Sequence, residues 1–439
     1  MKKKISLVIL LSLVLSFIAI NKFHTKYKFI SNIRWSAHKY LKEKIPEGLY
    51  VFIRLIGNNK IITLRTLNDY NVKFLPETQT TDLKFKKTAI PYLKKTEQGY
   101  YFKNQLYSYY FARYKKNLFI GSTNGEIFFL NFKNSNIEGK SFKKINHNLS
   151  NFKFSIRDIM IDENYLYLST INNSKNDCRF YQIYKAKINF SEKLNFKIIF
   201  SNKECAKSVQ GGKIQKFIFN NEKSILLTTA ADVWVKDTSE EDLKPQDDLS
   251  IYGKVLAINE KTGEHIIFSK GHRNPIGLYF DSQNNIILST ENGPKGGDEI
   301  NLIKYKKNYG WNVASYGTKY LPKFRDDGFP DYKSNHADYN FEEPVFAFVP
   351  SIGISEIIKL DNNFQEEWVD NYLFGSLYSR HLYRIKFDKS FSKIFFYEKI
   401  FIGERIRDLI YLEDEKKILL ALEETGSIGI ITIDNVKNQ

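Results

Sequence analysis

The sequence predicts an all-β protein. Aromatic residues make up 15% of the 439 residues and gather in alternating runs such as NLFIGSTNGEIFFLNF, a pattern typical of strands. From about residue 98 a unit recurs six times: a polar turn, a short apolar run and a small or hydroxyl-bearing residue. The copies read KNLFIGST, ENYLYLST, KSILLTTA, NNIILSTE, DNYLFGSL and KKILLALE. Because no convincing helical pattern follows residue 98, these strands indicate a β-propeller, which protects strand edges by radial repetition. A sandwich and a parallel β-helix remain alternatives.

The N-terminus predicts a signal anchor or signal peptide over residues 1–22. MKKK precedes an unbroken apolar run from Ile5 to Ile20. A charged start followed by such a run is typical of secretory signals. No small-x-small cleavage site follows, so the pattern favours an uncleaved membrane anchor, with a buried core helix as the alternative. The rest of the chain would then lie outside the cytoplasm, in the periplasm.

Residues 23–97 are interpreted as a tether and a short extra β segment. The stretch ISNIRWSAHKYLKEKI indicates a short helical piece, and LYVFIRLIG and KIITLRTL are strand candidates. The propeller itself is expected over 98–437.

The net charge of +17 admits two readings. It favours attraction to anions such as a membrane surface or an anionic small molecule. Alternatively, it reflects a Lys-rich composition, because the lysines are scattered along the chain. No nucleic-acid motif accompanies the charge, so a nucleic-acid partner is not expected.

The chain has two cysteines, Cys178 and Cys205, which flank a strand-turn-strand pattern. In an oxidising compartment such a pair often forms a disulfide. Two free buried thiols are the alternative. Their spacing to histidines indicates neither zinc nor haem.

Glycines and prolines crowd between two apolar runs in GHRNPIGLYF from Gly271 and TENGPKGGDEINLI from Thr290. Gly and Pro occur where the backbone itself must adopt a set shape. A backbone held in this way offers carbonyls or amides to a bound group.

These two motifs, with NYGWNVASYG from Asn308, resemble the soluble glucose/sorbosone dehydrogenase family, which includes aldose sugar dehydrogenases. GGKIQKFIFNNEKSILLTTAADVW, PQDDLSIYGKVLAINEKTG and the last repeat from Gly403 fit in the same order, so the resemblance covers about residues 98–435. It implies a six-bladed propeller that binds pyrroloquinoline quinone (PQQ) and calcium. It also implies oxidation of a sugar, or another alcohol or aldehyde, by hydride transfer to the quinone.

The resemblance assigns roles to individual residues. Arg273 and Asn274 would reach the quinone, and Asn292 would contact the cofactor. Arg405 and Arg407 would hold its carboxylates, for which the planar guanidinium is suited. The backbone carbonyls of Gly293 and Pro294 would ligate calcium, an ion that accepts carbonyl oxygens. Asp298 and Glu299 would bind a second ion or cap the loop, and His272 would be structural.

The chain departs from the family where the catalytic base is expected. The position of the family's histidine falls on Val209 or its neighbour Gln210, neither of which accepts a proton at neutral pH. Asp232, at the position of the acid that orients this histidine, is retained and is the remaining candidate base. A cofactor-contacting lysine is replaced by Tyr378, and the aromatic shelf reads AFVPSIGIS, with Phe346 and Val349.

Three hypotheses follow. The first is a membrane-tethered PQQ- and calcium-dependent sugar dehydrogenase, with an unidentified electron acceptor. The second is a propeller of the same family that binds a ligand but is catalytically impaired. The third is an unrelated interaction propeller, which the specific motifs disfavour.

Overall fold

Strands that are apolar on both faces explain the architecture. The computed structural model describes residues 73–75, 83–91, 93–98, 104–131, 142–149, 154–173, 178–189, 193–206, 209–231, 244–294, 296–318, 332–361 and 364–433. The chain divides into two units. One consists of Leu64–Gly317 and Lys333–Gln439 and is treated below. The other, Met1–Thr63 and Thr318–Tyr332, falls almost entirely outside the described residues.

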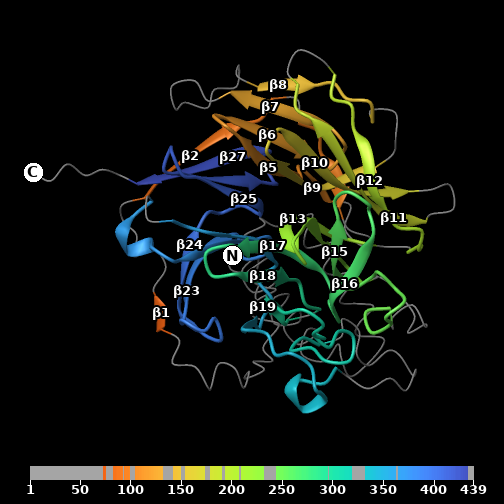
Figure 1. Cartoon of the computed structure of the whole chain (residues 1–439). Coiled ribbons are helices and arrows are strands. Elements are labelled where there is room, and N and C mark those ends of the chain that lie inside the picture. Colours follow the sequence, from red (N-terminus) through yellow and green to blue (C-terminus); the bar gives the residue numbers. More distant parts are fainter. Residues whose placement is uncertain are drawn as a thin grey trace, which may run out of the picture. The chain divides into compact units, whose positions relative to one another are not determined.

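The unit is a six-bladed β-propeller, as Figure 1 shows. Blade 1 contains β5 (Tyr109–Tyr114), β6 (Asn117–Ser122), β7 (Ile127–Asn131) and β8 (Phe142–Ile145). Blade 2 contains β9 (Phe154–Asp162), β10 (Tyr165–Asn173), β11 (Arg179–Lys187) and β12 (Lys197–Ser201). Blade 3 contains β13 (Gly211–Phe219), β14 (Glu222–Thr229), β15 (Lys254–Asn259) and β16 (His265–Lys270). Blade 4 contains β17 (Pro275–Asp281), β18 (Ile286–Glu291), β19 (Asp298–Ile303) and β20 (Phe346–Phe348). Blade 5 contains β21 (Ile354–Lys359), β22 (Tyr372–Ser376), β23 (His381–Phe387) and β24 (Ile394–Phe401). Blade 6 contains β25 (Ile406–Leu412), β26 (Lys417–Leu422) and β27 (Ser427–Ile433).

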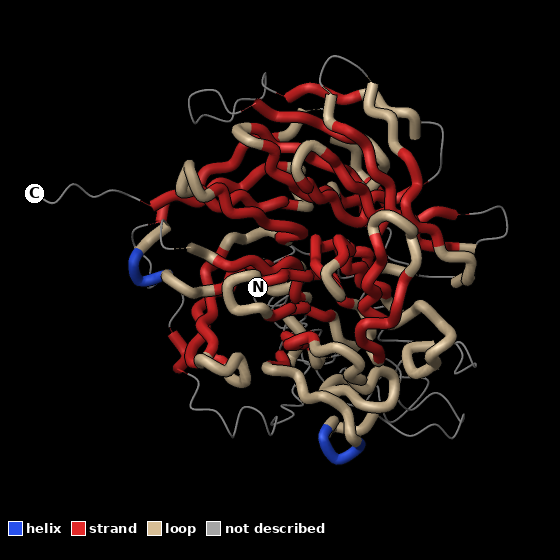
Figure 2. The backbone as a smooth tube through the Cα atoms, in the orientation of Figure 1, coloured by secondary structure: helices blue, strands red, loops and turns tan. Residues whose placement is uncertain are grey.

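The first strands of the blades form a closed ring. β5, β9, β13, β17, β21 and β25 each pack against the next, and β25 packs back against β5. The strands given above pair antiparallel in sequence order within each blade. Helix is confined to two short 3₁₀ turns among the described residues, Ala337–Tyr339 and Glu366–Trp368 (Figure 2). In the same part of the chain no helix is long and apolar enough to cross a membrane.

Apolar clusters fill every interface between neighbouring blades. On β6, Leu118 and Ile120 pack toward blade 6, whereas Phe119 packs toward blade 2. Four further clusters fill the remaining interfaces, including that between blades 5 and 6. Since both faces are covered, the second strands are continuous apolar runs and not alternating ones. Each blade contains one of the six recurring sequence units, and in every blade this unit is the second strand.

The N-terminal boundary of the propeller needs a correction. Residues 23–97 were expected to precede the propeller, but β2 (Leu83–Ala89) pairs antiparallel with β27 and forms the outer strand of blade 6. In addition, β1 (Lys73–Leu75) pairs parallel with β24 of blade 5. The physical reason is that β27 would otherwise expose an unpaired edge, which β2 covers. β3 (Thr96–Gln98) and β4 (Asn104–Leu106) form a separate hairpin. The predicted anchor over 1–22 and most of the tether lie outside the described residues.

Candidate functional site

The predicted cofactor and calcium residues, all of which the structure describes, lie at one rim of the propeller, where the first strands of blades 3 to 6 begin. Asn274 precedes β17, and its side-chain amide donates to Gln210 Oε1, which precedes β13, at 3.2 Å. The Asn274 carbonyl accepts from the Asn292 amide at 3.0 Å. Asn292 Nδ2 in turn donates to the Ile354 carbonyl at the start of β21, at 2.7 Å. Hydrogen bonds therefore connect the loops of three blades at this rim.

Arg273 and Asn274 are buried, yet each keeps an unused polar atom. Arg273 Nη1 donates to the Asn292 carbonyl at 2.7 Å, and its guanidinium lies 5.3 Å from the centroid of the Trp311 ring. Both backbone amides donate to Glu291 Oε1. Arg273 Nε and Asn274 Oδ1, however, have no hydrogen-bond partner among the described residues. Buried polar atoms without partners are rare in native proteins, so both atoms are available to a bound group.

His272 has a structural environment, in agreement with the sequence interpretation. Its ring is fully buried and stacks on Tyr309 with centroids 4.7 Å apart. Nδ1 lies 3.1 Å from Glu291 Oε2 and Nε2 lies 2.8 Å from Ser269 Oγ. With both nitrogens engaged inside the protein, His272 orients Glu291 and with it the Arg273–Asn274 turn.

Asp298 caps the Gly-Pro loop. Its Oδ1 accepts from the Gly293 amide at 3.1 Å, and Oδ2 accepts from the amides of Ile352, Gly353 and Ile354 at 3.0, 2.6 and 3.0 Å. Burial raises the pKa of Asp298, although these amide donors oppose the shift. Of the two alternatives for Asp298, the structure therefore supports the cap. Glu299 on β19 lies opposite Glu291 on β18 in the strand register. Burial together with the charge of Glu291 raises the pKa of Glu299 well above its usual range.

The Gly-Pro loop folds back closely on itself. A Cβ on Gly293 would lie 2.0 Å from the Gly297 carbonyl oxygen, so only glycine fits at this position. The Pro294 carbonyl accepts from Ser351 Oγ at 3.4 Å. The loop follows Asn292 directly in the chain and therefore lies at the same rim as Arg273, which donates to the Asn292 carbonyl.

Arg405 and Arg407 share one buried carboxylate. Glu423 Oε2 accepts from Arg405 Nε at 2.9 Å, and Oε1 accepts from Arg407 Nε at 2.6 Å. Burial acts to raise the pKa of Glu423, but the two guanidinium groups lower it to about 2. Two cations on one anion leave a net positive charge. Arg405 Nη1 also donates to the Leu377 carbonyl at 3.0 Å, and the Leu377 amide donates to Gly353, whose own amide binds Asp298. The arginine pair is therefore connected to the Gly-Pro loop.

The positions that depart from the family have clear environments. Val209 is 4% exposed and packs in the apolar cluster between blades 2 and 3. Phe346 is buried in the core between blades 4 and 5, whereas Val349 is partly exposed. The Tyr378 amide donates to the Ile352 carbonyl at 3.0 Å, which holds its backbone beside the Gly-Pro loop. Asp232 lies outside the described residues.

Three residues that contact the predicted site residues were not themselves predicted: Glu291, Glu423 and Trp311. The recurring units carried a signal for the two glutamates, since NNIILSTE and KKILLALE both end in Glu. Glu291 accepts from the backbone amides of Arg273 and Asn274, at the start of blade 4. Glu423 accepts from the side chains of Arg405 and Arg407, at the start of blade 6. Trp311 belongs to the quoted NYGW motif, but nothing in its spacing indicated that it would contact Arg273.

Cys178 and Cys205 are joined by a disulfide, with Cα atoms 5.1 Å apart. The next residues, Arg179 and Ala206, exchange two backbone hydrogen bonds of 2.9 and 3.1 Å. The link ties the segment before β13 to the start of β11.

The chain is similar to proteins of a known family. The model of the family described as "Glucose / Sorbosone dehydrogenase" matches residues 115–430. Aldose sugar dehydrogenase YliI of Escherichia coli is 30% identical over 175 residues, which are 39% of this chain and 45% of that protein. The chain thus spans less than half of the length of the curated relatives that it matches.

Two solved structures share the fold. The apo form of the soluble aldose sugar dehydrogenase from Escherichia coli has a TM-score of 0.63 and 17% identity, over 80% of this chain and 99% of that one. The PQQ-bound form of aldose sugar dehydrogenase from Streptomyces coelicolor has a TM-score of 0.57 and 17% identity, over 80% and 98%. With the family match covering most of the propeller, the chain belongs to the glucose/sorbosone dehydrogenase family.

Proposed function

We propose that this protein binds PQQ at the rim and oxidises a sugar or another alcohol or aldehyde. The observation that carries the proposal is the pair of buried atoms without partners, Arg273 Nε and Asn274 Oδ1, one a donor and the other an acceptor. A carbonyl-rich, anionic quinone would satisfy the donor and supply a counter-charge for the guanidinium.

The arginine pair fits an anionic ligand in the same way. Arg405 and Arg407 share the single charge of Glu423, so the group keeps one net positive charge beside the Gly-Pro loop. PQQ carries three carboxylates. Because planar guanidinium groups bind carboxylates in fixed geometry, we assign Arg405 and Arg407 to these carboxylates and Asn292 to a neighbouring contact.

A calcium ion would bind at the carbonyls of Gly293 and Pro294. Calcium takes carbonyl oxygens as ligands, and the close packing of Gly293 against Gly297 fixes the direction of the loop. When bound, PQQ supplies a hydride acceptor, and calcium polarises it as a Lewis acid. Arg273 and Asn274 would hold the ligand, and Asp232 would take the hydroxyl proton of the substrate.

Location follows from the N-terminal sequence. The apolar run from Ile5 to Ile20 supports export, and the bond between Cys178 and Cys205 is of a kind that persists outside the cytoplasm. We therefore propose a periplasmic propeller, anchored in the inner membrane, that passes electrons to a separate acceptor.

A second candidate function is binding without turnover. It is favoured by Val209, a buried apolar side chain where the family has its base, and by Gln210, whose amide is engaged by Asn274. A missing base typically costs about 10²–10⁴-fold in rate.

The test is titration of the purified full chain with PQQ and calcium, followed by sugars. Under the first proposal the quinone spectrum appears on binding and bleaches when an aldose or alcohol is added. Binding without bleaching supports the second function. Arg273→Ala should abolish binding, whereas Arg113→Ala, a change in an exposed ion pair of blade 1, should leave it intact. Absence of quinone uptake by the wild type would overturn both.

A further inference from the structure

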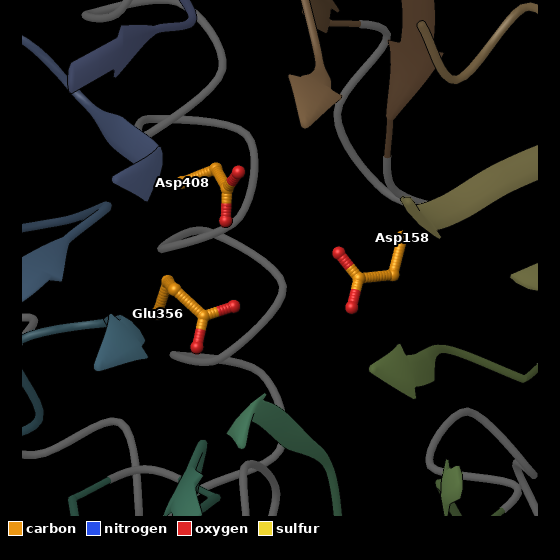
Figure 3. A group of neighbouring side chains, drawn as sticks. All are labelled: Asp158, Glu356 and Asp408. Atoms are coloured by element: carbon orange, nitrogen blue, oxygen red, sulfur yellow. The ribbon is translucent and has the colours of Figure 1, made fainter. Parts of the chain in front are cut away.

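A buried ion cluster lies at the centre of the ring of first strands. Lys213 Nζ lies 2.8 Å from Asp158 Oδ1 and 3.1 Å from Asp408 Oδ1, and it also contacts Glu356 Oε2. All four side chains are at most 8% exposed. Figure 3 shows the three carboxylates turned toward one another from different strands. The face of the Tyr110 ring adds a fourth contact, 4.9 Å from the ammonium.

Each carboxylate also joins two neighbouring blades. Asp158 of blade 2 accepts from the Ile214 amide of blade 3 at 2.9 Å. Asp408 of blade 6 accepts from the Phe111 amide of blade 1 at 2.7 Å. Glu356 of blade 5 accepts from the Leu278 amide of blade 4 at 3.1 Å. Because Lys213 binds all three, a single ammonium connects the six blades.

Local irregularities in the strands turn these side chains inward. The pairing of β13 with β14 shifts register between Gly211 and Ile214, around Lys213. The same kind of shift surrounds Glu356 on β21 and Asp408 on β25. A bulge in a strand redirects a side chain. Here the bulges bring the side chains of Lys213, Glu356 and Asp408 together.

The cluster is directly connected to the candidate site. The Lys213 amide donates to Thr228 Oγ1 at 3.0 Å, and Thr228 Oγ1 donates to the Pro275 carbonyl of blade 4 at 3.0 Å. The Gly211 carbonyl accepts from Arg157 Nε at 3.1 Å. The preceding residue, Gln210, holds the Asn274 amide. Lys213, which carries the axial ammonium, is therefore only three positions along the chain from Gln210 at the rim.

We propose that Lys213 is a positioning residue, which fixes the segment Val209–Gly212 relative to Asn274 through its bonds to three other blades. The inference rests on the proposed function, because that segment borders the site assigned to PQQ. Lys213 would not touch the ligand. Its role is to hold the start of β13 so that Gln210 keeps its hydrogen bond to the Asn274 side chain.

The test uses the full chain with Lys213→Met and Lys213→Arg, and Arg384→Met as the matched control. Arg384 also forms a buried ion pair, with Glu398 at 2.7 Å, but lies in the third strand of blade 5. Hydrogen exchange of the amides of residues 209–217 is measured without ligand, and PQQ affinity is measured with calcium. Both are recorded at a temperature where each variant is fully folded by circular dichroism.

The expected result separates positioning from general stability. Lys213→Met should speed exchange in the segment and weaken PQQ binding by about 10-fold or more, the range typical of residues that support a ligand contact. Lys213→Arg should restore much of both, and Arg384→Met should change neither. Equal effects of Lys213→Met and Arg384→Met on the segment, or none, would overturn the inference.

Two further outcomes are distinguishable. If the wild type takes up no PQQ, the proposed function fails, but hydrogen exchange still tests the role of Lys213. If Lys213→Met does not fold, the double variant Lys213→Met with Asp158→Asn is used in its place. It leaves one fewer buried carboxylate without a counter-charge. Wild-type exchange and affinity in this folded double variant would also overturn the inference.

Discussion

Asn274 Nδ2 donates a hydrogen bond to Gln210 Oε1 at 3.2 Å, so the residue that follows Val209 is tied to the fourth blade. This contact engages the side chain of Gln210 in holding the rim. The family's histidine falls on Val209 or Gln210, so this contact leaves Val209 as the position at which to test for a base.

Val209→His should therefore raise turnover. With PQQ and calcium bound, a histidine at this position would supply a proton acceptor, and the rate of sugar oxidation should rise about 10²-fold or more. Val209→Leu is the control, since it changes the buried side chain without adding a base. Steady-state rates for a panel of aldoses provide the measurement. Equal rates for the two variants would show that the missing base does not limit the reaction.

Glu423→Gln should destabilise the propeller. The substitution leaves Arg407 buried without its counter-charge, and we expect a loss of about 3 kcal/mol in the free energy of unfolding at pH 7. The pKa of Glu423 is lowered to about 2, so its contribution is present above the unfolded value near 4.5 and is lost as the pH falls toward 2. The difference between the proteins, measured by urea denaturation, should accordingly shrink below about pH 4.

Glu424 provides the control for that experiment. It pairs with Arg380 at 2.8 Å, and both side chains are about one-fifth exposed or more. Glu424→Gln should therefore cost no more than about 1 kcal/mol. A similar loss for both variants would mean that burial of the shared carboxylate is not the cause.

The sequence predicted the fold better than the site. Each recurring unit, such as KNLFIGST, marks the second strand of a blade because that strand is covered on both faces and must be apolar throughout. The role of β2 was missed, since LKFKKTA has little apolar pattern and its place depends on an edge far away in sequence. The partners Glu423 and Lys213 were missed for the same reason: the contacts of a buried charge are set by strand register and bulges, which no local pattern encodes.

The disulfide should contribute to stability. Cys178 and Cys205 close a loop with a sequence separation of 27 residues, for which chain entropy gives about 3 to 4 kcal/mol. Cys178→Ser with Cys205→Ser should lower the free energy of unfolding by up to this amount. A reducing agent should have a comparable effect on the wild type and none on the double variant. Unchanged thermal unfolding of the wild type after complete reduction, checked by thiol titration, would contradict the prediction.

Glu356→Gln should change how stability depends on pH. Burial raises the pKa of Glu356 to about 8, and Lys213 only partly opposes the shift. A carboxyl with a raised folded pKa binds a proton more tightly in the folded state. Its contribution is therefore fully present below the unfolded value near 4.5 and is lost as the pH rises through 8. Glutamine resembles the protonated form and does not titrate.

The wild type should consequently lose stability relative to Glu356→Gln by about 1 kcal/mol per pH unit between pH 5 and 8. Asp158, with a pKa raised to about 6, and Lys254, with a pKa lowered to about 7, titrate in both proteins. Their effects cancel to first order when the two curves are subtracted. Urea denaturation at half-unit pH steps gives the difference directly. Parallel curves over this range would show that Glu356 is already ionised in the folded cluster.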